Sequence, residues 1–580
     1  MNAALFLLAV LSPIVVAVLS AFPSIRKVTD SIAPWTAAMA FGATFGVRPE
    51  VTIDLPWLML GARVGLDVTG QLFLAFTSLL WLLAGVYARS YLRNDAGRHR
   101  FFAFYLVAMA GNFGLILAHD LLTFVAFFAM MSFSAYGLIT HDRHAESWRA
   151  GRTYIILVVL GEVLLFAGLV LAALQADSLL FEDVRAVIAL SSARDVIVAL
   201  LLVGFGIKLG VVPLHFWLPL AHPVAPTPAS AVLSGAMIKA GLLGWMRFLP
   251  LGEAVMPNWG ALCIVVGFMA AFYGVIVGLT HINAKTVLAY SSVSQMGLVV
   301  VAVGSAFTGP TAWPTVSAAL AVFALHHAIS KGALFLGVGV ADGKFDASWK
   351  RWLVCVGLML PALALAGAPF TLGGAAKVAL NQATTSGVTP WAELCEVSLP
   401  ISSIATTLLM ARFLFLVWPH PREEHHKLSP GMWLPWSLLV TGVVGMTWAL
   451  YWHGALDPYW FKTTPASLWK NTWPIAAGTG LAVFVLCNER LSAWLSRLYF
   501  PAGDVVVPIA AMWLRLVMFW NRRLLNPLAH CSSLVSSWWS ATDAPNVTLP
   551  FSRLSLLESW GAVGLLVMLL AAALFVLLVL

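Results

Sequence analysis

The chain has 580 residues, of which 61% are apolar and only 10% are charged, as 33 Lys and Arg and 25 Asp and Glu. An average soluble protein carries about 25% charged residues, so this chain could not cover several soluble domains with polar surface. The composition therefore excludes a soluble enzyme, a disordered chain and a nucleic-acid-binding protein, and it leaves a polytopic helical membrane protein. The net charge of +8 is then explained by basic loops on one side of a membrane.

Apolar stretches follow one another along nearly the whole chain. A membrane-spanning helix needs about 20 mostly apolar residues. The candidates number about sixteen, at residues 3–22, 32–46, 66–88, 101–118, 121–140, 153–175, 196–220, 228–249, 259–280, 286–303, 316–340, 353–380, 391–418, 432–452, 472–488 and 559–580. The first stretch has no basic start and no clear small-residue cleavage site, so we expect a retained helix rather than a signal peptide.

Lys and Arg residues fall into two alternating sets of loops. One set is denser and its loops are shorter, and the positive-inside rule places it in the cytoplasm with the N-terminus outside. It comprises Arg26, Lys27, Arg89, Arg93, Arg98, Arg100, Arg143, Arg149, Arg152, Lys285, Lys344, Lys350, Arg351, Arg422 and Lys427, and the opposite set comprises Arg48, Arg63, Arg185, Arg194, Lys462 and Lys470. We expect a multi-pass protein of the inner (plasma) membrane.

The C-terminal region has a different pattern. Residues 491–558 contain several Arg among Trp and Leu and no good span, which predicts an amphipathic arm along the membrane surface or along partner helices. Residues 559–580 are predicted to form a final transmembrane anchor.

A small group of ionisable residues lies inside the predicted spans. Such residues are costly in a membrane, so each is a candidate functional residue. They are Glu162, Lys208, Lys239, His326, His327, Lys331 and Lys377. The alternative for each is a structural pair or a side chain that reaches the membrane surface from a helix end.

Two of these lysines share a context, because each lies in an apolar span interrupted by Gly and Pro. Lys208 precedes Gly210 and Pro213, and Lys377 follows Gly367 and Pro369. Broken helices at corresponding places in two halves of a chain indicate an ion site near the middle of the membrane. A low-dielectric site disfavours the charged form of lysine, so such a lysine can take up and release a proton near neutral pH.

The histidines lie on the span between the two broken helices. His326 and His327 are one helical turn from Lys331, and an unperturbed histidine titrates near pH 6.5. These three residues could connect the two lysines, or they could form a hydrogen-bonded structural cluster.

Several segments resemble the antiporter-like subunits of respiratory complex I. In their residue sequence they are most similar to the large membrane subunit of formate hydrogenlyase and related group 4 hydrogenases. The longest is Lys208-Leu-Gly-Val-Val-Pro213-Leu-His215-Phe-Trp-Leu-Pro219-Leu-Ala-His222 and its continuation to Lys239. Others are Lys285-Thr-Val-Leu-Ala-Tyr-Ser-Ser, His327-Ala-Ile-Ser-Lys331, and Gly367-Ala-Pro369 through Lys377. The resemblance covers roughly residues 60–420.

The resemblance implies an all-α polytopic membrane protein with about 14–16 transmembrane helices, broken helices and two inverted five-helix repeats. The implied divisions are residues 1–100 (first helices), 101–250 (first repeat), 251–420 (second repeat) and 421–490 (additional helices). It also implies proton transfer along a polar axis. Four positions match the family's charged positions on helices six, seven, eight and twelve, namely Glu162, Lys208, Lys239 and Lys377.

One departure from the family pattern affects the first repeat. The family has a glutamate on helix five that faces the lysine on helix seven, and this chain has Ala129 there. Either Glu162 takes the role of partner to Lys208, or this half of the protein no longer transfers protons. Lesser departures are Asn283 and Thr286, where the family usually has Asp and Arg.

The leading hypothesis is a proton-translocating subunit of a multisubunit redox-driven membrane complex. The five cysteines form no CxxC pair and no phosphate-binding glycine loop is present, so we expect no cofactor in this chain and electron transfer in partner subunits, including a peripheral redox module. Two alternatives are a structural anchor that has lost pumping, motivated by Ala129, and a subunit of a cation/proton antiporter or ion-driven uptake system.

Overall fold

The computed structural model describes residues 2–58, 61–345, 348–385, 391–418, 426–427, 429–461, 464–488, 490, 500–501 and 512. The chain divides into two compact units, residues 1–500 and 501–580, and the description below concerns the first. The predicted arm at 491–558 falls almost entirely outside the described residues, and the predicted anchor at 559–580 lies entirely outside them.

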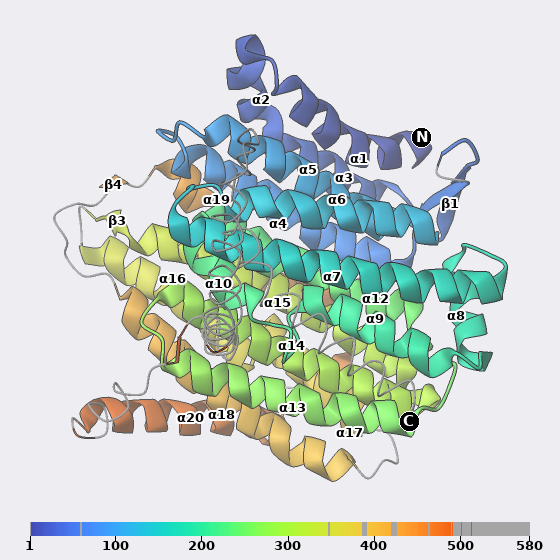
Figure 1. Ribbon diagram of the computed structural model, residues 1–580. Coiled ribbons are helices and arrows are strands. Elements are labelled where there is room, and N and C mark those ends of the chain that lie inside the picture. Colours follow the sequence, from blue (N-terminus) through green and yellow to red (C-terminus); the bar gives the residue numbers. More distant parts are fainter. Residues whose placement is uncertain are drawn as a thin grey trace, which may run out of the picture. The chain divides into compact units, whose positions relative to one another are not determined.

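The described part is built almost entirely from helices (Figure 1). The α-helices are α1 (Asn2–Leu19), α2 (Arg26–Ile32), α3 (Thr36–Gly46), α4 (Val68–Tyr91), α5 (Arg98–Leu117), α6 (Leu121–Ile139), α7 (Ala145–Ala176), α8 (Phe181–Leu190), α9 (Arg194–Leu209), α10 (Trp217–Val224), α11 (Thr227–Val232), α12 (Lys239–Phe248), α13 (Pro257–Leu279), α14 (Ala284–Thr308), α15 (Trp313–Ala341), α16 (Ser348–Ala366), α17 (Leu372–Thr385), α18 (Ala392–Val417), α19 (Pro430–Trp452) and α20 (Pro465–Cys487).

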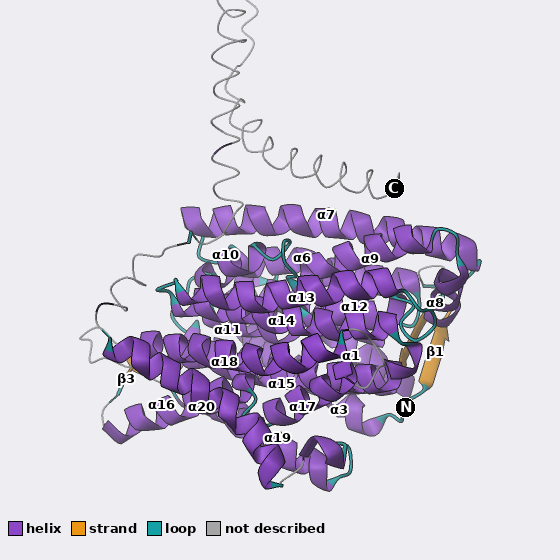
Figure 2. Ribbon diagram, turned by 90° about the horizontal axis from the view of Figure 1, so that it is seen from below, coloured by secondary structure: helices purple, strands orange, loops and turns teal. Residues whose placement is uncertain are grey.

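Shorter elements connect these helices. They are the 3-10 turns η1 (Pro23–Ile25), η2 (Ala33–Trp35), η4 (Pro310–Ala312) and η5 (Pro458–Phe461), the π-helical segment η3 (Leu233–Met237), the antiparallel strands β1 (Val51–Leu55) and β2 (Ala62–Leu66), and the short parallel strands β3 (Gly343–Lys344) and β4 (His426–Lys427). Figure 2 shows the β1–β2 hairpin at one end of the long helices.

Eleven helical segments in the described residues are long and apolar enough to cross a membrane, or twelve if α1 and the sharply bent segment that follows it form one further span. This confirms the predicted polytopic all-helical fold. The sequence suggested more spans because it included stretches whose helices are short, such as the 11-residue α3 and the 16-residue α9. It also included the stretch at 559–580.

The order of the helices repeats along the chain. From α5 the chain forms three long helices, the short connecting helix α8, a broken helix made of α9 and α10, and a fifth segment made of α11, η3 and α12. From α13 it again forms three long helices, a broken helix made of α16 and α17, and a fifth helix, α18. Five is an odd number, so five crossings would place the start of the second set on the opposite side of the membrane from the start of the first. The helix order thus agrees with two inverted five-helix sets.

Glycines allow α13 and α14 to pack in close backbone contact. Gly260, Gly267 and Gly274 on α13 recur every seven residues. Gly260 faces Gly304 on α14, Gly267 faces Gly297, and Gly274 faces the backbone of Tyr290 and Ser294. A Cβ atom added at Gly267 would lie 2.6 Å from the carbonyl oxygen of Gly297. Small residues favour helix association in membranes because they let backbones approach closely. This interface holds α14 in the interior, where its apolar span is completely buried, as is that of α15.

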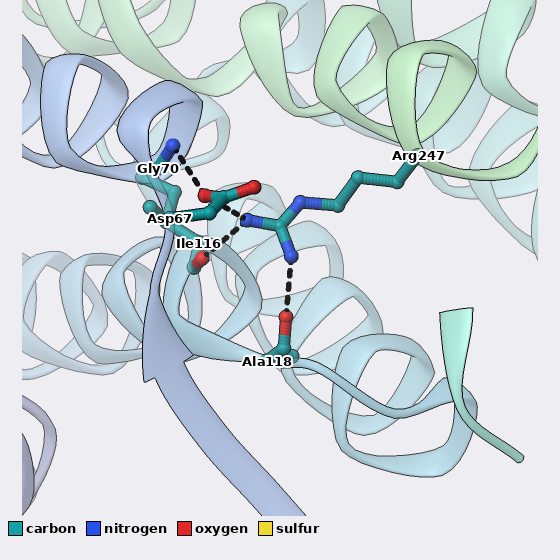
Figure 3. A network of polar contacts seen from close by, with 5 residues as sticks. All are labelled: Asp67, Gly70, Ile116, Ala118 and Arg247. Carbon is teal, nitrogen blue, oxygen red and sulfur yellow. Dashed lines mark hydrogen bonds and ion pairs between the residues drawn. The ribbon is translucent and has the colours of Figure 1, made fainter. Parts of the chain in front are cut away.

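Arg247, near the end of α12, joins three helices through a polar network (Figure 3). Its guanidinium group donates to the carbonyl oxygens of Ile116 and Ala118, at 3.0 and 2.6 Å, and to Asp67 Oδ1 at 3.2 Å. Asp67 caps the first turn of α4 and also accepts from the amide of Gly70 at 2.6 Å. The network therefore ties the start of α4 and the end of α5 to α12, the helix that begins at Lys239.

His119 lies beside this network, in the connection between α5 and α6. Burial, reinforced by the positive charge of Arg247, lowers the pKa of His119 from its ordinary 6.5 to about 4. Its ring stacks on Phe181, with the ring centroids 6.3 Å apart. Burial favours the neutral carboxyl form of Asp67, but Arg247 and the amide of Gly70 hold its pKa below the usual value. The folded protein therefore favours a neutral His119 and an ionised Asp67.

We predict that Gly267→Ala destabilises the protein by about 1–3 kcal/mol, because its Cβ must push α13 away from α14. Gly445→Ala is the matched control, since Gly445 also lies in a long helix and a Cβ there meets no atom within 4 Å. Alanine favours a helix over glycine by about 1 kcal/mol, so the control should be neutral or stabilising. Thermal unfolding of the purified chain in detergent measures both. Equal midpoints for the two variants would contradict the close glycine interface.

We also predict that stability falls as the pH is lowered from about 6.5 towards about 4, because the unfolded chain takes up a proton at His119 in this range and the folded protein does not. The shift corresponds to at most about 3 kcal/mol. His119→Phe keeps the stacked ring and removes the titration. Its unfolding midpoint should therefore drop less than that of the wild type between about pH 7 and about pH 5. Parallel pH curves for the two proteins would assign the acid sensitivity to other groups.

Candidate functional site

Lys208 lies at the end of its helix, in a buried pocket formed by three helices. It lies next to the last residue of α9, before Gly210 turns the chain with a φ of 78°. The side chain is only 3% exposed. Its Nζ atom donates to the hydroxyl oxygens of Ser132 on α6 and Tyr154 on α7, both at 3.1 Å. Tyr154 in turn donates to the backbone carbonyl of Ser132 at 2.9 Å, which fixes the phenol in position.

Glu162 shares this pocket with Lys208. The two residues line one cavity of about 10 Å³, which is close to the smallest volume that holds one water molecule. Their charges act on each other across it. Ala129, in contrast, does not line the cavity, which takes Phe128 and Ser132 from the same helix. Glu162 is therefore the acidic residue that lies with Lys208 in this half of the protein.

Lys239 is positioned by the π-helical segment η3. In an α-helix the amide of Ile238 would bond to the carbonyl of Ser234, but here it bonds to Leu233 at 3.2 Å. The Ser234 carbonyl accepts instead from Nζ of Lys239 at 2.6 Å. Single π turns inside α-helices are frequently found at functional sites. The widened turn thus supplies a backbone acceptor for a side chain that is 1% exposed.

The same lysine contacts the central helix α15. Nζ of Lys239 lies 2.6 Å from Nδ1 of His327, and both side chains are completely buried. One turn further along α15, Lys331 donates to the carbonyl oxygen of Leu288 on α14 at 2.7 Å. Two lysines and a histidine therefore lie together between α12, α14 and α15, and the charge of each lysine acts on His327.

His326 points towards the second broken helix. Its Nδ1 lies 3.3 Å from the hydroxyl of Ser330, and its Nε2 has no hydrogen-bond partner among the described residues. The ring is close to the start of α17, since a Cβ added at Gly373 would lie 2.6 Å from His326 Cε1. Lys377 lies on the same helix, where its Nζ donates to the hydroxyl of Ser403 on α18 at 2.7 Å. The charge of Lys377 acts on His326.

The seven candidates thus form two groups. Glu162 and Lys208 lie together between α6, α7 and α9, while Lys239, His327, Lys331, His326 and Lys377 follow one another from α12 across α15 to α17. The helices that carry Lys208 and Lys239, α9 and α12, pack closely on each other, because a Cβ at Gly241 would lie 2.6 Å from the carbonyl oxygen of Phe205. Lys208 makes its hydrogen bonds with α6 and α7, and Lys239 makes its own with η3 and α15.

The other predicted residues mark the helix breaks. Pro213 and His215 lie in the connection between α9 and α10, and Pro219 lies within α10. Pro369 lies in the connection between α16 and α17, where Gly367 has a φ of 97°. These breaks confirm that both predicted spans are interrupted.

His222, on the short helix α10, is completely buried. Its ring stacks on Phe335 of α15 with centroids 4.6 Å apart. Neither ring nitrogen has a hydrogen-bond partner among the described residues. The carbonyl of His222 accepts from the hydroxyl of Ser230, which joins α10 to α11.

The sequence did not single out the residues that hold the lysines. Ser132, Tyr154 and Ser403 are hydroxyl groups within apolar helices, and nothing in their local pattern distinguishes them from other buried serines and tyrosines. Asn283, noted as a departure from the family's aspartate, keeps a structural role. Its side chain caps α14 by accepting from the amides of Lys285 and Thr286.

Two broken helices at the fourth place of two five-helix sets, with buried lysines beside the breaks, define a polytopic membrane protein of the antiporter-like class. A family model described as "NADH:quinone oxidoreductase/Mrp antiporter, TM" matches residues 118–399, which contain all seven candidates. Over these residues, about half of the chain, the protein is therefore similar to the antiporter-like membrane subunit family.

Curated relatives come from several kinds of membrane protein. The chain is 31% identical over 304 residues to hydrogenase-4 component B of Escherichia coli (strain K12), covering 51% of this chain and 45% of that protein. It is 29% identical over 395 residues to a putative antiporter subunit of Staphylococcus saprophyticus, covering 63% of this chain and 48% of that one. The chain thus spans about half the length of these relatives.

Two solved structures share the fold. The Mrp complex from Dietzia sp. DQ12-45-1b matches 94% of this chain and 64% of its own chain, with a TM-score of 0.72 and 22% identity. The membrane-bound sulfane sulfur reductase, an archaeal respiratory membrane complex, matches 83% of this chain and 99% of its own chain, with a TM-score of 0.66 and 18% identity.

Proposed function

We propose that this chain translocates protons through the membrane along the row of basic residues from Lys239 to Lys377. The observation that carries the proposal is the 2.6 Å contact between Lys239 Nζ and His327 Nδ1, with both groups completely buried. Two basic nitrogens at this distance share one proton. It lies either on the lysine, which then donates to a neutral imidazole, or on the imidazolium, which then donates to a neutral amine. Moving that proton between them is one elementary step of a relay.

The neighbouring residues make this step responsive to charge. Lys331 acts electrostatically on His327 and Lys239, so a change in its charge alters which of the two holds the proton. His326 is one residue from His327 and lies against α17, which brings the row to Lys377. Lys377 lines a cavity of about 370 Å³, so this end of the row has room for water. Glu162 and Lys208 supply a second pair whose charges act on each other.

The chain would work as one membrane subunit of a larger redox-driven complex. Hydrogenase-4 component B and the sulfane sulfur reductase are parts of such assemblies by their names, which supports membrane partner subunits. We infer that electrons are handled by a peripheral redox module in partner subunits and that this chain binds no cofactor of its own. Because the relatives include antiporter subunits, cation/proton exchange is the second candidate function. The position of Glu162 in the same cavity as Lys208 weighs against an anchor that lost its acidic partner at Ala129.

We infer that the end of the helices rich in Lys and Arg faces the cytoplasm and that the N-terminus is outside. Loops far apart in sequence meet at this end. Arg98 pairs with Asp30 at 3.3 Å, and the positive charge of Lys285 is attracted by the negative charges of Asp142 and Asp342. The predicted outer end carries the β1–β2 hairpin, in which Arg63 pairs with Asp54 at 2.6 Å. The positive-inside rule supports this orientation in the inner membrane.

We predict that Lys239→Met and His327→Phe, introduced into the intact complex and reconstituted in vesicles, each lower the proton flux at least about tenfold, since an elementary step is removed. The double variant should be no slower than the slower single variant, because the two residues act as one unit. Lys27→Met removes an exposed lysine of α2 and is the matched control, with unchanged flux.

Wild-type flux in either single variant would contradict the relay. A proton flux that requires sodium on the opposite side of the vesicle would favour the cation/proton antiporter instead. Complete absence of coupled flux in the wild-type complex would favour the structural anchor.

The orientation predicts which exposed positions can be labelled in intact cells. In a variant without the exposed Cys487, a cysteine introduced by Asp54→Cys should react with a membrane-impermeant maleimide added outside. A cysteine introduced by Lys27→Cys should react only after the cells are permeabilised. The reverse pattern would place the N-terminus inside.

A further inference from the structure

The cavity beside Lys377 is too large to serve only a lysine side chain. Its volume of about 370 Å³ is within the range of small-molecule sites. It lies between α17, α18 and the segment formed by η5 and α20. Its polar lining comes mainly from side chains that carry hydrogen-bond donors, namely Lys377, Lys470, Asn381, Gln382, Asn471 and Ser403.

The charge of this lining is one-sided. Two ammonium groups, those of Lys377 and Lys470, contribute to the wall, and none of the described residues that line the cavity is Asp or Glu. Gln382 is also oriented as a donor. The indole nitrogen of Trp460 can only donate, and it bonds to Gln382 Oε1 at 2.7 Å, so the amide NH₂ group remains to donate to another group. A cavity with these features fits an anion.

The remaining walls are apolar, and the neighbouring helix α20 has an exposed apolar side. Leu298, Leu399 and Pro474 line the cavity together with the polar groups. Further along α20, Leu481 and Phe484 are 48% and 59% exposed, as expected for a helix side in contact with acyl chains. A ligand with an anionic group and an apolar body, drawn from the bilayer beside α20, matches both parts of the cavity. Basic pockets between membrane helices bind anionic lipid headgroups in this way.

An anionic ligand in this cavity would lie beside the ammonium group of Lys377. Lys208 lies in a cavity with the carboxylate of Glu162, whereas the hydrogen bond of Lys377 goes to the neutral hydroxyl of Ser403. We propose that this cavity binds the phosphate group of an anionic phospholipid, and that this phosphate provides the negative charge beside Lys377. The lipid then occupies, in the second five-helix set, the electrostatic role that Glu162 has in the first.

The test measures binding without proton flux, so it stands or falls independently of the proposed relay. The full-length chain, purified and stripped of lipid in a non-ionic detergent, is titrated with phosphatidylglycerol, phosphatidylcholine or inorganic phosphate while its thermal unfolding is followed. A ligand that binds only the folded protein raises the midpoint in proportion to its saturation. Phosphatidylglycerol should raise the midpoint by several degrees, and phosphatidylcholine at the same concentration should not.

Two variants separate the site from general lipid binding. Lys470→Gln and Asn471→Leu should each weaken the apparent affinity for phosphatidylglycerol at least about tenfold. Lys27→Gln, which removes an exposed lysine of α2, should not change it. The midpoints of all three without lipid serve as the folding check. Equal responses to the two lipids, or wild-type affinity in both cavity variants, would overturn the proposal. A response to inorganic phosphate equal to that for phosphatidylglycerol would overturn the lipid assignment.

Discussion

An ammonium group buried among apolar helices must be given hydrogen-bond acceptors, and this requirement shapes the whole interior. A regular α-helix has few to give, because its carbonyl groups are already bonded within the helix. The protein provides them in two ways. Hydroxyl groups from neighbouring helices accept hydrogen bonds from Lys208 and Lys377. The backbone carbonyls of Ser234 and Leu288 accept hydrogen bonds from Lys239 and Lys331. The helix breaks, the π segment and the central position of α15 all serve this requirement.

The choice of neutral acceptors has a chemical consequence. A carboxylate bonded directly to a buried lysine stabilises the charged form strongly, and removing the proton then becomes costly. A hydroxyl or a carbonyl stabilises the charged form less, so the lysine can change its charge when a neighbour does. All four lysines, Lys208, Lys239, Lys331 and Lys377, have only neutral groups as their hydrogen-bond partners in the described residues. Such groups suit residues that must change their protonation state repeatedly.

The sequence predicted much of this architecture for physical reasons that are local. Apolar length predicts a span, and Gly and Pro within a span predict a break, so the polytopic fold and the breaks near Lys208 and Lys377 could be found. The number of spanning helices was harder to predict from the sequence, because two short helices that meet at a break look like one interrupted apolar stretch. The acceptors could not be found, since the Ser234 carbonyl is available only because η3 widens, and Ser403 is brought to Lys377 by the packing of α17 on α18. The cavity beside Lys377 depends on residues nearly a hundred positions apart.

The π-helical turn also sets the direction in which everything after it points. Each residue of an α-helix advances about 100° around the axis, so a turn that accommodates one extra residue rotates the rest of the helix by about that angle. Lys239 faces His327 with this rotation in place, and so does the remainder of α12 down to Arg247 in its network with Asp67. The widened turn therefore sets the rotational register in which Lys239 meets His327 and Arg247 meets Asp67.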